Sequence, residues 1–233
     1  MIDVSKSLLG SSLSAPFGFD SLGRPLLSRI ALGTFNSVLV AAGGAVLALG
    51  IGLLVGVLNV FFLRRIDGFI LRSLDILNTI PNFVYVMAIG GMLWNWPPIL
   101  RLCISTGLVH WIVIARIMRL KLYETEQKDF IVASKALGAS RMRLLFRHMI
   151  PQFADDLLLI GINQFSAILS QEAFISFIGF GFSPPETSLG LLLQDGWRML
   201  AVSPHLVFGP GLMLMLILFS LYSLRMERLE KSI

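Results

Sequence analysis

The side chains that could do chemistry are few, and they stand far apart in this 233-residue chain. There are three histidines and a single cysteine, Cys103, which lies in an apolar run. One cysteine allows no intrachain disulfide and supplies no metal-ligand cluster. The dipeptide Gly-Lys occurs nowhere, so the chain carries no phosphate-binding P-loop. We find no constellation for catalysis, and we expect a chain that is not an enzyme and that binds no metal or cofactor itself.

The strongest concentration of charge is a basic segment, residues 119–152, between two apolar runs. Residues 127–137 and 141–149 of this segment are expected to form two short helices. Gly138 suits a helix end that needs a positive φ angle, and Ser140 can cap the second helix. A rigid, cationic helix–turn–helix would fit a groove on a soluble partner. The alternative, from the residues alone, is an ordinary solvated loop.

The elements that position this segment are expected to be membrane-spanning helices. Hydrophobic residues make up 55% of the chain and charged residues 14%, whereas soluble domains carry about 25% charged residues. Apolar runs at 35–63, 74–94, 99–118, 157–180 and 206–224 can each cross a bilayer as a helix. The sequence therefore predicts an all-α polytopic membrane protein with five transmembrane helices. Residues 1–30 would form a non-spanning extracytoplasmic segment, and 31–233 the transmembrane domain.

Charge also predicts the orientation of the chain. Fourteen of the 19 Lys and Arg residues fall in one set of loops, which includes the basic segment and the C-terminal tail. Lys and Arg accumulate in cytoplasmic loops. We therefore expect the N-terminus outside the cell, and both the basic segment and the C-terminus in the cytoplasm. Orientation in the lipid bilayer accounts for the basic balance, which we do not attribute to nucleic-acid binding.

Polar side chains inside the predicted spans are a second candidate site. Such groups are costly in lipid unless they face a cavity or a partner. Five of them are predicted either to line a translocation path or to make hydrogen bonds at a subunit interface: Asn78, Asn82, Gln164, Gln171 and Glu172. The last three share one helical face. His110, beside Trp111, is expected to be a hydrogen-bonded packing residue rather than a ligand.

The residues of the basic segment resemble those of a known family. The stretches Ala133-Ser-Lys-Ala-Leu-Gly-Ala-Ser140 and Phe146-Arg-His-Met-Ile-Pro151 resemble the EAA loop of ABC importer permeases. The resemblance is strongest to the dipeptide, oligopeptide and nickel branch. Residues 16–29, 171–181, 184–190 and 208–211 resemble further motifs of that branch in the same order, so the resemblance covers about residues 16–224.

The resemblance implies a type I importer permease core that lacks the usual first helix. Such a permease works with a second homologous permease, two cytoplasmic ATPase subunits that hydrolyse ATP with Mg, and an extracytoplasmic substrate-binding protein. Peptides are the expected substrate, and nickel or another metal chelate is the alternative. An ATP-independent channel or ion-coupled transporter would be a different class. It would need inverted repeats or paired intramembrane charges, and we recognise neither.

The same resemblance implies that the loop docks into a cleft on an ATPase subunit. Eight residues are expected to make this coupling contact: Phe130, Ala133, Ser134, Lys135, Leu137, Gly138, Ala139 and Arg141. Phe130 would fill an apolar pocket, while Lys135 and Arg141 would meet acidic or carbonyl groups. The glutamate that names the motif is Val132 here. Docking is therefore expected to depend on Phe130, the glycine turn and the two cations rather than on a carboxylate.

Overall fold

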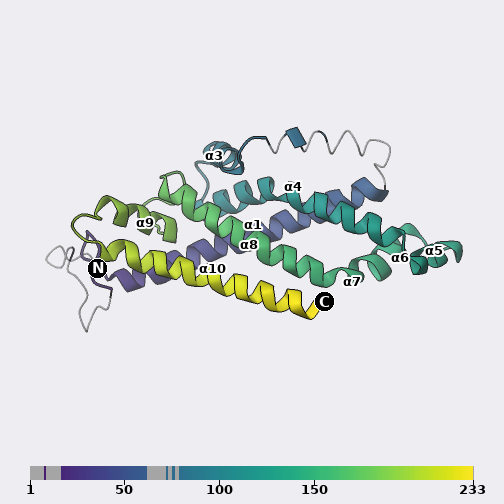
Figure 1. Ribbon diagram of the computed structural model, residues 1–233. Helices are drawn as coiled ribbons and strands as arrows, with labels where there is room; N and C mark the ends of the chain where they lie inside the picture. The colour runs from purple at the N-terminus through teal and green to yellow at the C-terminus, as the bar shows by residue number, and fades with distance from the viewer. Residues whose placement is uncertain (1–7, 9–16, 62–71, 73–74, 77–78, 233) are drawn as a thin grey trace.

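The computed structural model describes residues 8, 17–61, 72, 75–76 and 79–232 (Figure 1). Over these residues the regular structure is helical, apart from an isolated bridge between Phe19 and Pro25, which confirms the all-α prediction. The helices are α1 (Leu26–Phe61), α3 (Asn82–Met92), α4 (Pro98–Glu126), α5 (Asp129–Ala136), α6 (Arg141–Leu144), the π-helical turn η2 (Leu145–Met149), α7 (Ile150–Gln152), α8 (Ala154–Phe177), α9 (Leu189–Arg198) and α10 (His205–Ser232).

Four of the described helices, α1, α4, α8 and α10, are long and apolar enough to cross a membrane. They correspond to the first, third, fourth and fifth predicted spans. The second predicted span, 74–94, lies partly outside the described residues and is represented by α3, an apolar helix of 11 residues. The predicted count of five is therefore approximate.

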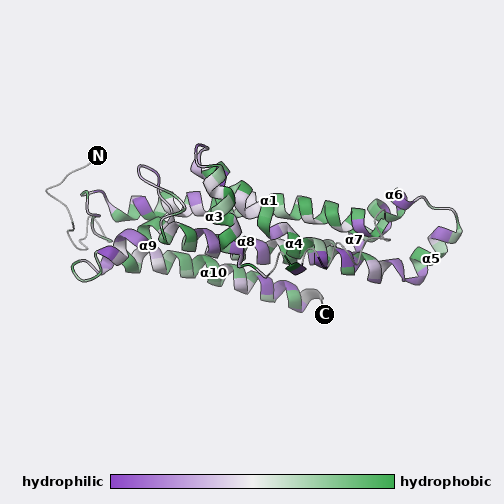
Figure 2. Ribbon diagram, turned by 90° about the horizontal axis from the view of Figure 1, so that it is seen from above, coloured by the Kyte–Doolittle hydropathy of each residue, from purple (hydrophilic) through white to green (hydrophobic). Residues whose placement is uncertain are grey.

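The long helices lie side by side in an elongated bundle (Figure 1). One end of the bundle carries α9, which we call the α9 end. The opposite end carries α5 and α6, which we call the α5 end. Hydrophobic residues dominate the middle of α1 and α10, and hydrophilic residues gather around α5 and the C-terminal end of α10 (Figure 2).

The closest helix pair is α1 and α4, which pack along much of their length. Glycines in α1 make this approach possible. A Cβ atom added at Gly52 would lie 2.5 Å from Cβ of Ile114, and one added at Gly56 would lie 2.8 Å from Cβ of Met118. Small residues at this spacing let helices approach closely in lipid. The α1–α4 pair thus forms the frame on which the other helices pack.

Two apolar clusters close the two ends of the bundle. The cluster at the α5 end joins α1 and α4 to the segment between α4 and α8, and its core includes Val60, Leu122, Ile131, Leu144 and Met149. The cluster at the α9 end joins α1, α9 and α10 through Leu26, Ile30, Leu189, Leu192 and Leu206. Each end of the protein is therefore held by side chains distant in sequence.

Two predicted boundaries differ from the structure. The helix predicted to begin at residue 35 begins at Leu26, and its first turn includes Arg29, which is buried and donates to the carbonyl of Pro185 before α9 at 3.5 Å. The stretch between the predicted spans at 157–180 and 206–224, for which no helix was predicted, contains α9. Ser188 caps this helix by accepting a hydrogen bond from the Leu191 amide, a signal that sequence reasoning missed.

Candidate functional site: the basic segment and a polar network

The basic segment forms the predicted helix–turn–helix. α5 ends at Ala136, and Gly138 has a φ angle of +82°, in the region that favours glycine. The Ser140 hydroxyl accepts from the Arg143 amide at 3.4 Å and caps α6. The second predicted helix, 141–149, is interrupted, because its last five residues form the π-helical turn η2. Such turns are often found at functional sites.

One face of this segment is fixed to the bundle. Ile131 of α5 is completely buried, and Leu144 and Leu145 of the α6–η2 region are almost as buried. They pack in the same cluster as Val60 of α1 and Leu122 of α4. The segment is therefore attached to the two helices that form the frame of the bundle.

The other face presents apolar side chains to the surroundings. Leu137 is 89% exposed and Phe130 is 41% exposed. Val132, which replaces the glutamate of the motif, is also exposed, so no carboxylate stands at this position. Ala133 is exposed as well. Ser134 is half-buried, and its hydroxyl donates to the Phe130 carbonyl at 2.7 Å. Contiguous exposed apolar groups are typical of an interaction surface.

The two predicted contact cations have partners within the chain. Lys135 Nζ lies 2.6 Å from Glu126 Oε1, and Arg141 Nη1 donates to the Phe61 carbonyl at 2.9 Å. Both line a hollow of about 380 Å³ under the turn, next to half-buried Ala139. Their expected contact with a partner stays a prediction. The contacts seen here fasten the basic segment to the ends of α1 and α4.

The second candidate site is a polar network between α4 and α8. His110 Nδ1 lies 2.9 Å from Gln164 Oε1, and His110 Nε2 lies 2.7 Å from Gln171 Oε1. His110 and Gln164 are buried, and Gln171 is half-buried. Both ring nitrogens thus have partners, as expected of a packing histidine. The network ties two spanning helices together at the level of the membrane.

Two of the remaining predicted path residues, Asn82 and Glu172, are not brought to this network. Asn82 is half-buried at the first position of α3, and Asn78 lies outside the described residues. Glu172 has no exposed surface and faces the junction of α8 with the loop before α9, where the Ser176 hydroxyl donates to its Oε1 at 2.7 Å. The role of all five residues in a path or a subunit interface stays a prediction.

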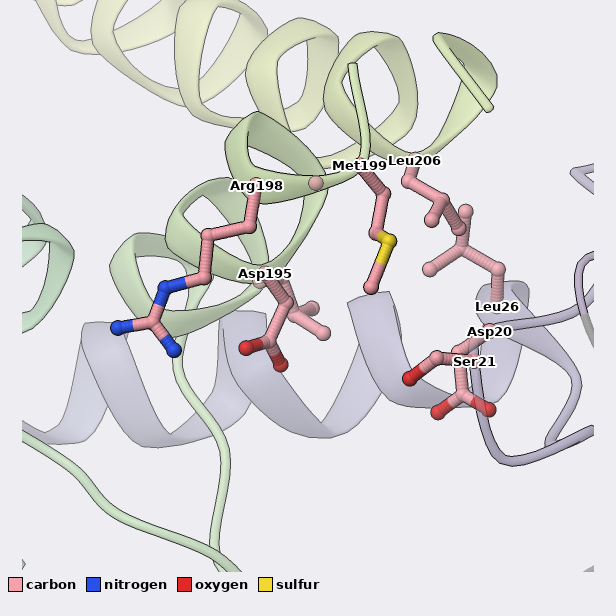
Figure 3. Close-up of a pocket in the computed structure, with 9 residues that line it drawn as sticks. Asp20, Ser21, Leu26, Asp195, Arg198, Met199 and Leu206 are labelled. Atoms are coloured by element: carbon pink, nitrogen blue, oxygen red, sulfur yellow. The ribbon is translucent and has the colours of Figure 1, made fainter. Parts of the chain in front are cut away.

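A small charged cavity of about 140 Å³ lies at the α9 end (Figure 3). Asp195 and Arg198 line it from α9, and Asp20 and Ser21 line it from the segment before α1. Burial raises the pKa of the Asp195 carboxyl, and the nearby Arg198 opposes this rise. Sequence reasoning missed this cavity because its walls come from segments about 175 residues apart.

Long apolar helices joined through an exposed helix–turn–helix are the features of a polytopic helical membrane protein. The solved structures bear this out for the fold. An inward-facing form of the methionine ABC transporter MetNI superposes with a TM-score of 0.70 at 16% identity, covering 89% of this chain and 97% of that chain. An amino acid ABC transporter superposes with a TM-score of 0.65 at 15% identity.

Sequence comparison supplies the family. Residues 22–230 match the model of the binding-protein-dependent transport system inner membrane component, and the chain belongs to this family. The oligopeptide transport permease OppC of Salmonella typhimurium is 33% identical over 203 residues, covering 87% of this chain and 67% of the relative. OppC of Haemophilus influenzae is 31% identical, with 87% and 65% covered. The dipeptide permease DppC of Lactococcus lactis is 29% identical, with 85% and 57% covered. The chain thus spans about 57–67% of the length of these relatives.

Proposed function

We propose that this chain is a membrane-spanning subunit of an ABC importer for peptides. The proposal is carried by the basic segment, residues 119–152, which we call the coupling segment. It is an exposed apolar helix–turn–helix on a buried base, in a member of a binding-protein-dependent transport family. The relatives reported above carry the names of oligopeptide and dipeptide permeases. These names support peptides as the transported class.

The partners follow from the same proposal. Two cytoplasmic ATPase subunits would supply energy, a second homologous permease would form the other half of the path, and an extracytoplasmic protein would deliver the peptide. The segment 119–152 would lie in the cytoplasm with the C-terminus, and the N-terminus would lie outside. Charge distribution supports this orientation.

The contacts of the coupling segment suggest how force would pass into the membrane. An ATPase that grips Phe130 and Leu137 would pull on α5, which is fixed through Ile131 to the ends of α1 and α4. The segment also continues through α7 into α8, and Lys121 of α4 pairs with Asp156 of α8 at 2.9 Å. A displaced ATPase would therefore move three spanning helices together.

The proposal is tested by reconstitution with an ATPase, a second permease and a binding protein, whose genes we expect beside this one. We expect ATP-dependent uptake of labelled peptide into proteoliposomes and no uptake when this chain is omitted. A nickel chelate offered in parallel should not be taken up. ATP-independent uptake by this chain alone would contradict the importer assignment, and uptake of the chelate but not peptide would contradict the substrate.

A further inference from the structure

Glu172 is a buried acid that the coupling mechanism does not use. It lies in the second half of α8, and none of its surface is exposed. The Ser176 hydroxyl donates to Oε1 at 2.7 Å, Ser37 on α1 and Ser188 before α9 lie near the same carboxyl, and its Oε2 has no hydrogen-bond partner. Within the described part of the chain, no basic side chain forms an ion pair with it.

The three serines connect this carboxyl to the backbone of the loop that leads into α9. The Phe182 amide donates to Ser176 Oγ at 3.3 Å, the Leu189 amide to Ser37 Oγ at 3.1 Å, and the Leu191 amide to Ser188 Oγ at 3.2 Å. A hydroxyl that accepts through its oxygen still has one proton to donate. The Ser176 proton is used on Glu172 Oε1, and the buried Oε2 of the same carboxyl has no hydrogen-bond partner, so it is free to accept from the neighbouring Ser37 and Ser188 hydroxyls.

The elements around the carboxyl are closely packed. A Cβ atom at Gly190 would overlap the backbone of Ala173, so the start of α9 lies directly against α8. Asn36 of α1 donates through Nδ2 to the Thr187 carbonyl at 2.8 Å. The start of α9 is therefore held against both α1 and α8, and Glu172 lies where the three elements meet.

We propose that Glu172 is a positioning residue that fastens the start of α9 to α8 and α1, so that the α9 end moves as one body with α8. α8 follows the coupling segment directly, so a movement that enters at the α5 end would reach the α9 end through this carboxyl. The transmission step rests on the proposed importer function. The fastening itself does not.

Hydrogen exchange on the purified chain tests the fastening without any transport. Glu172→Leu leaves the serine hydroxyls without their acceptor, so the amides of Phe182, Leu189 and Leu191 should exchange about tenfold faster or more. Glu172→Gln should keep nearly normal exchange, because its amide oxygen accepts from Ser176 and each serine oxygen has a second lone pair for its NH₂ group. Peptides covering 129–144 provide the internal control and should not change.

Unchanged exchange over 182–191 in a folded Glu172→Leu variant would overturn the proposal. If that variant does not fold, Ser37→Ala provides a smaller lesion that should expose the Leu189 amide alone, and unchanged exchange at Leu189 would have the same meaning. In the assembled importer, Glu172→Leu should bind the ATPase and hydrolyse ATP while transport falls at least about tenfold, and Glu172→Gln should restore transport. Normal transport by Glu172→Leu would contradict the transmission step. If the wild-type complex itself does not transport peptide, the proposed function is wrong, and the exchange result is unaffected.

Discussion

The two ends of the bundle use their side chains in opposite ways. At the α5 end, Leu137 and Phe130 point outward from a segment whose inner face is anchored by Ile131. At the α9 end, Glu172 and Ser188 turn inward and are completely buried. One end exposes apolar groups, and the other end buries polar groups within the chain.

This difference shows which parts of the chain can be changed without loss of folding. Exposed apolar groups contribute little to the stability of the isolated chain, so their loss should affect binding. Buried polar groups cost free energy when a partner is removed, so their loss should affect local order first. Variants at the two ends should therefore separate binding from folding.

The largest expected effect comes from Gly138→Pro. The φ angle of +82° lies outside the range that proline can adopt, so the helix–turn–helix must change shape. No atom lies within 4 Å of an added Cβ, and the chain should still fold. We expect co-purification with the ATPase to fall by at least about tenfold, equal to about 1.4 kcal/mol.

Gly50→Ala is the matched control for this variant. Gly50 lies inside α1 and also has no atom within 4 Å of an added Cβ. Alanine favours a helix over glycine by up to about 1 kcal/mol, so folding and ATPase binding should be kept. Equal ATPase recovery with Gly138→Pro and Gly50→Ala would contradict a role for the turn.

Leu137→Asp should have the next largest effect. Placing a charge on the most exposed apolar side chain of the coupling segment should weaken ATPase binding with little change in the melting temperature of the chain. Val202→Asp is the comparison at the α9 end, where Val202 is 72% exposed. A loss of ATPase binding caused equally by both variants would show that the effect is not local.

His110→Ala tests the buried polar network. Gln164 and Gln171 would both lose their partner, and we expect a loss of about 1–2 kcal/mol in stability. Thermal unfolding in detergent measures it, with ATPase binding as the second readout. Unchanged unfolding would show that the glutamines find other partners, and loss of ATPase binding alone would place His110 in coupling.

A smaller effect is expected from the Lys135–Glu126 pair. Both side chains are partly exposed, and such pairs contribute about 0–1 kcal/mol. Lys135→Glu should weaken the local fold slightly, and the swap Lys135→Glu with Glu126→Lys should restore it. If the swap restores stability but not ATPase binding, Lys135 also contacts the ATPase. If the swap restores both, Lys135 acts only through its pair with Glu126.

The smallest effect should be a pH dependence from Asp195. Because burial raises the pKa of its carboxyl, its protonated form is favoured in the folded state. The stability that it contributes is therefore complete below its ordinary value of 3.8 and is lost as pH rises through the raised value. Asp195→Asn should remove this slope from a series of unfolding curves between about pH 4 and pH 7, and an unchanged slope would assign it to another group.

Much of this arrangement follows from the sequence. Apolar runs predicted the four long helices α1, α4, α8 and α10. Gly138 predicted the turn after α5, and Ser140 predicted the cap of α6. Helical periodicity also placed Gln164 and Glu172 on one face of α8, and both are buried. These features depend on residues that are near one another in the chain.

Most of the features that sequence reasoning missed depend on how separate elements meet, and one of them, α9, depends on a local signal that was overlooked. The serine that fixes the Leu189 amide to α1 stands 152 positions away, and no local pattern gives that distance. Likewise, nothing near Lys135 indicates that Glu126 would be its partner, because the chain must turn between α4 and α5 before they meet. The helix α9 was not predicted, because only its Ser188 cap distinguishes it from the surrounding Gly- and Pro-rich segment.

The most direct test of the account is site-specific cross-linking at the two ends. In a Cys103→Ser background, Leu137→Cys and Val202→Cys each carry one thiol for a photoreactive probe, in membranes that contain the assembled importer. The account predicts an adduct between Leu137→Cys and the ATPase subunit, and none from Val202→Cys. Absence of the adduct at Leu137→Cys, or its appearance at Val202→Cys, would contradict the assignment of the α5 end as the coupling surface.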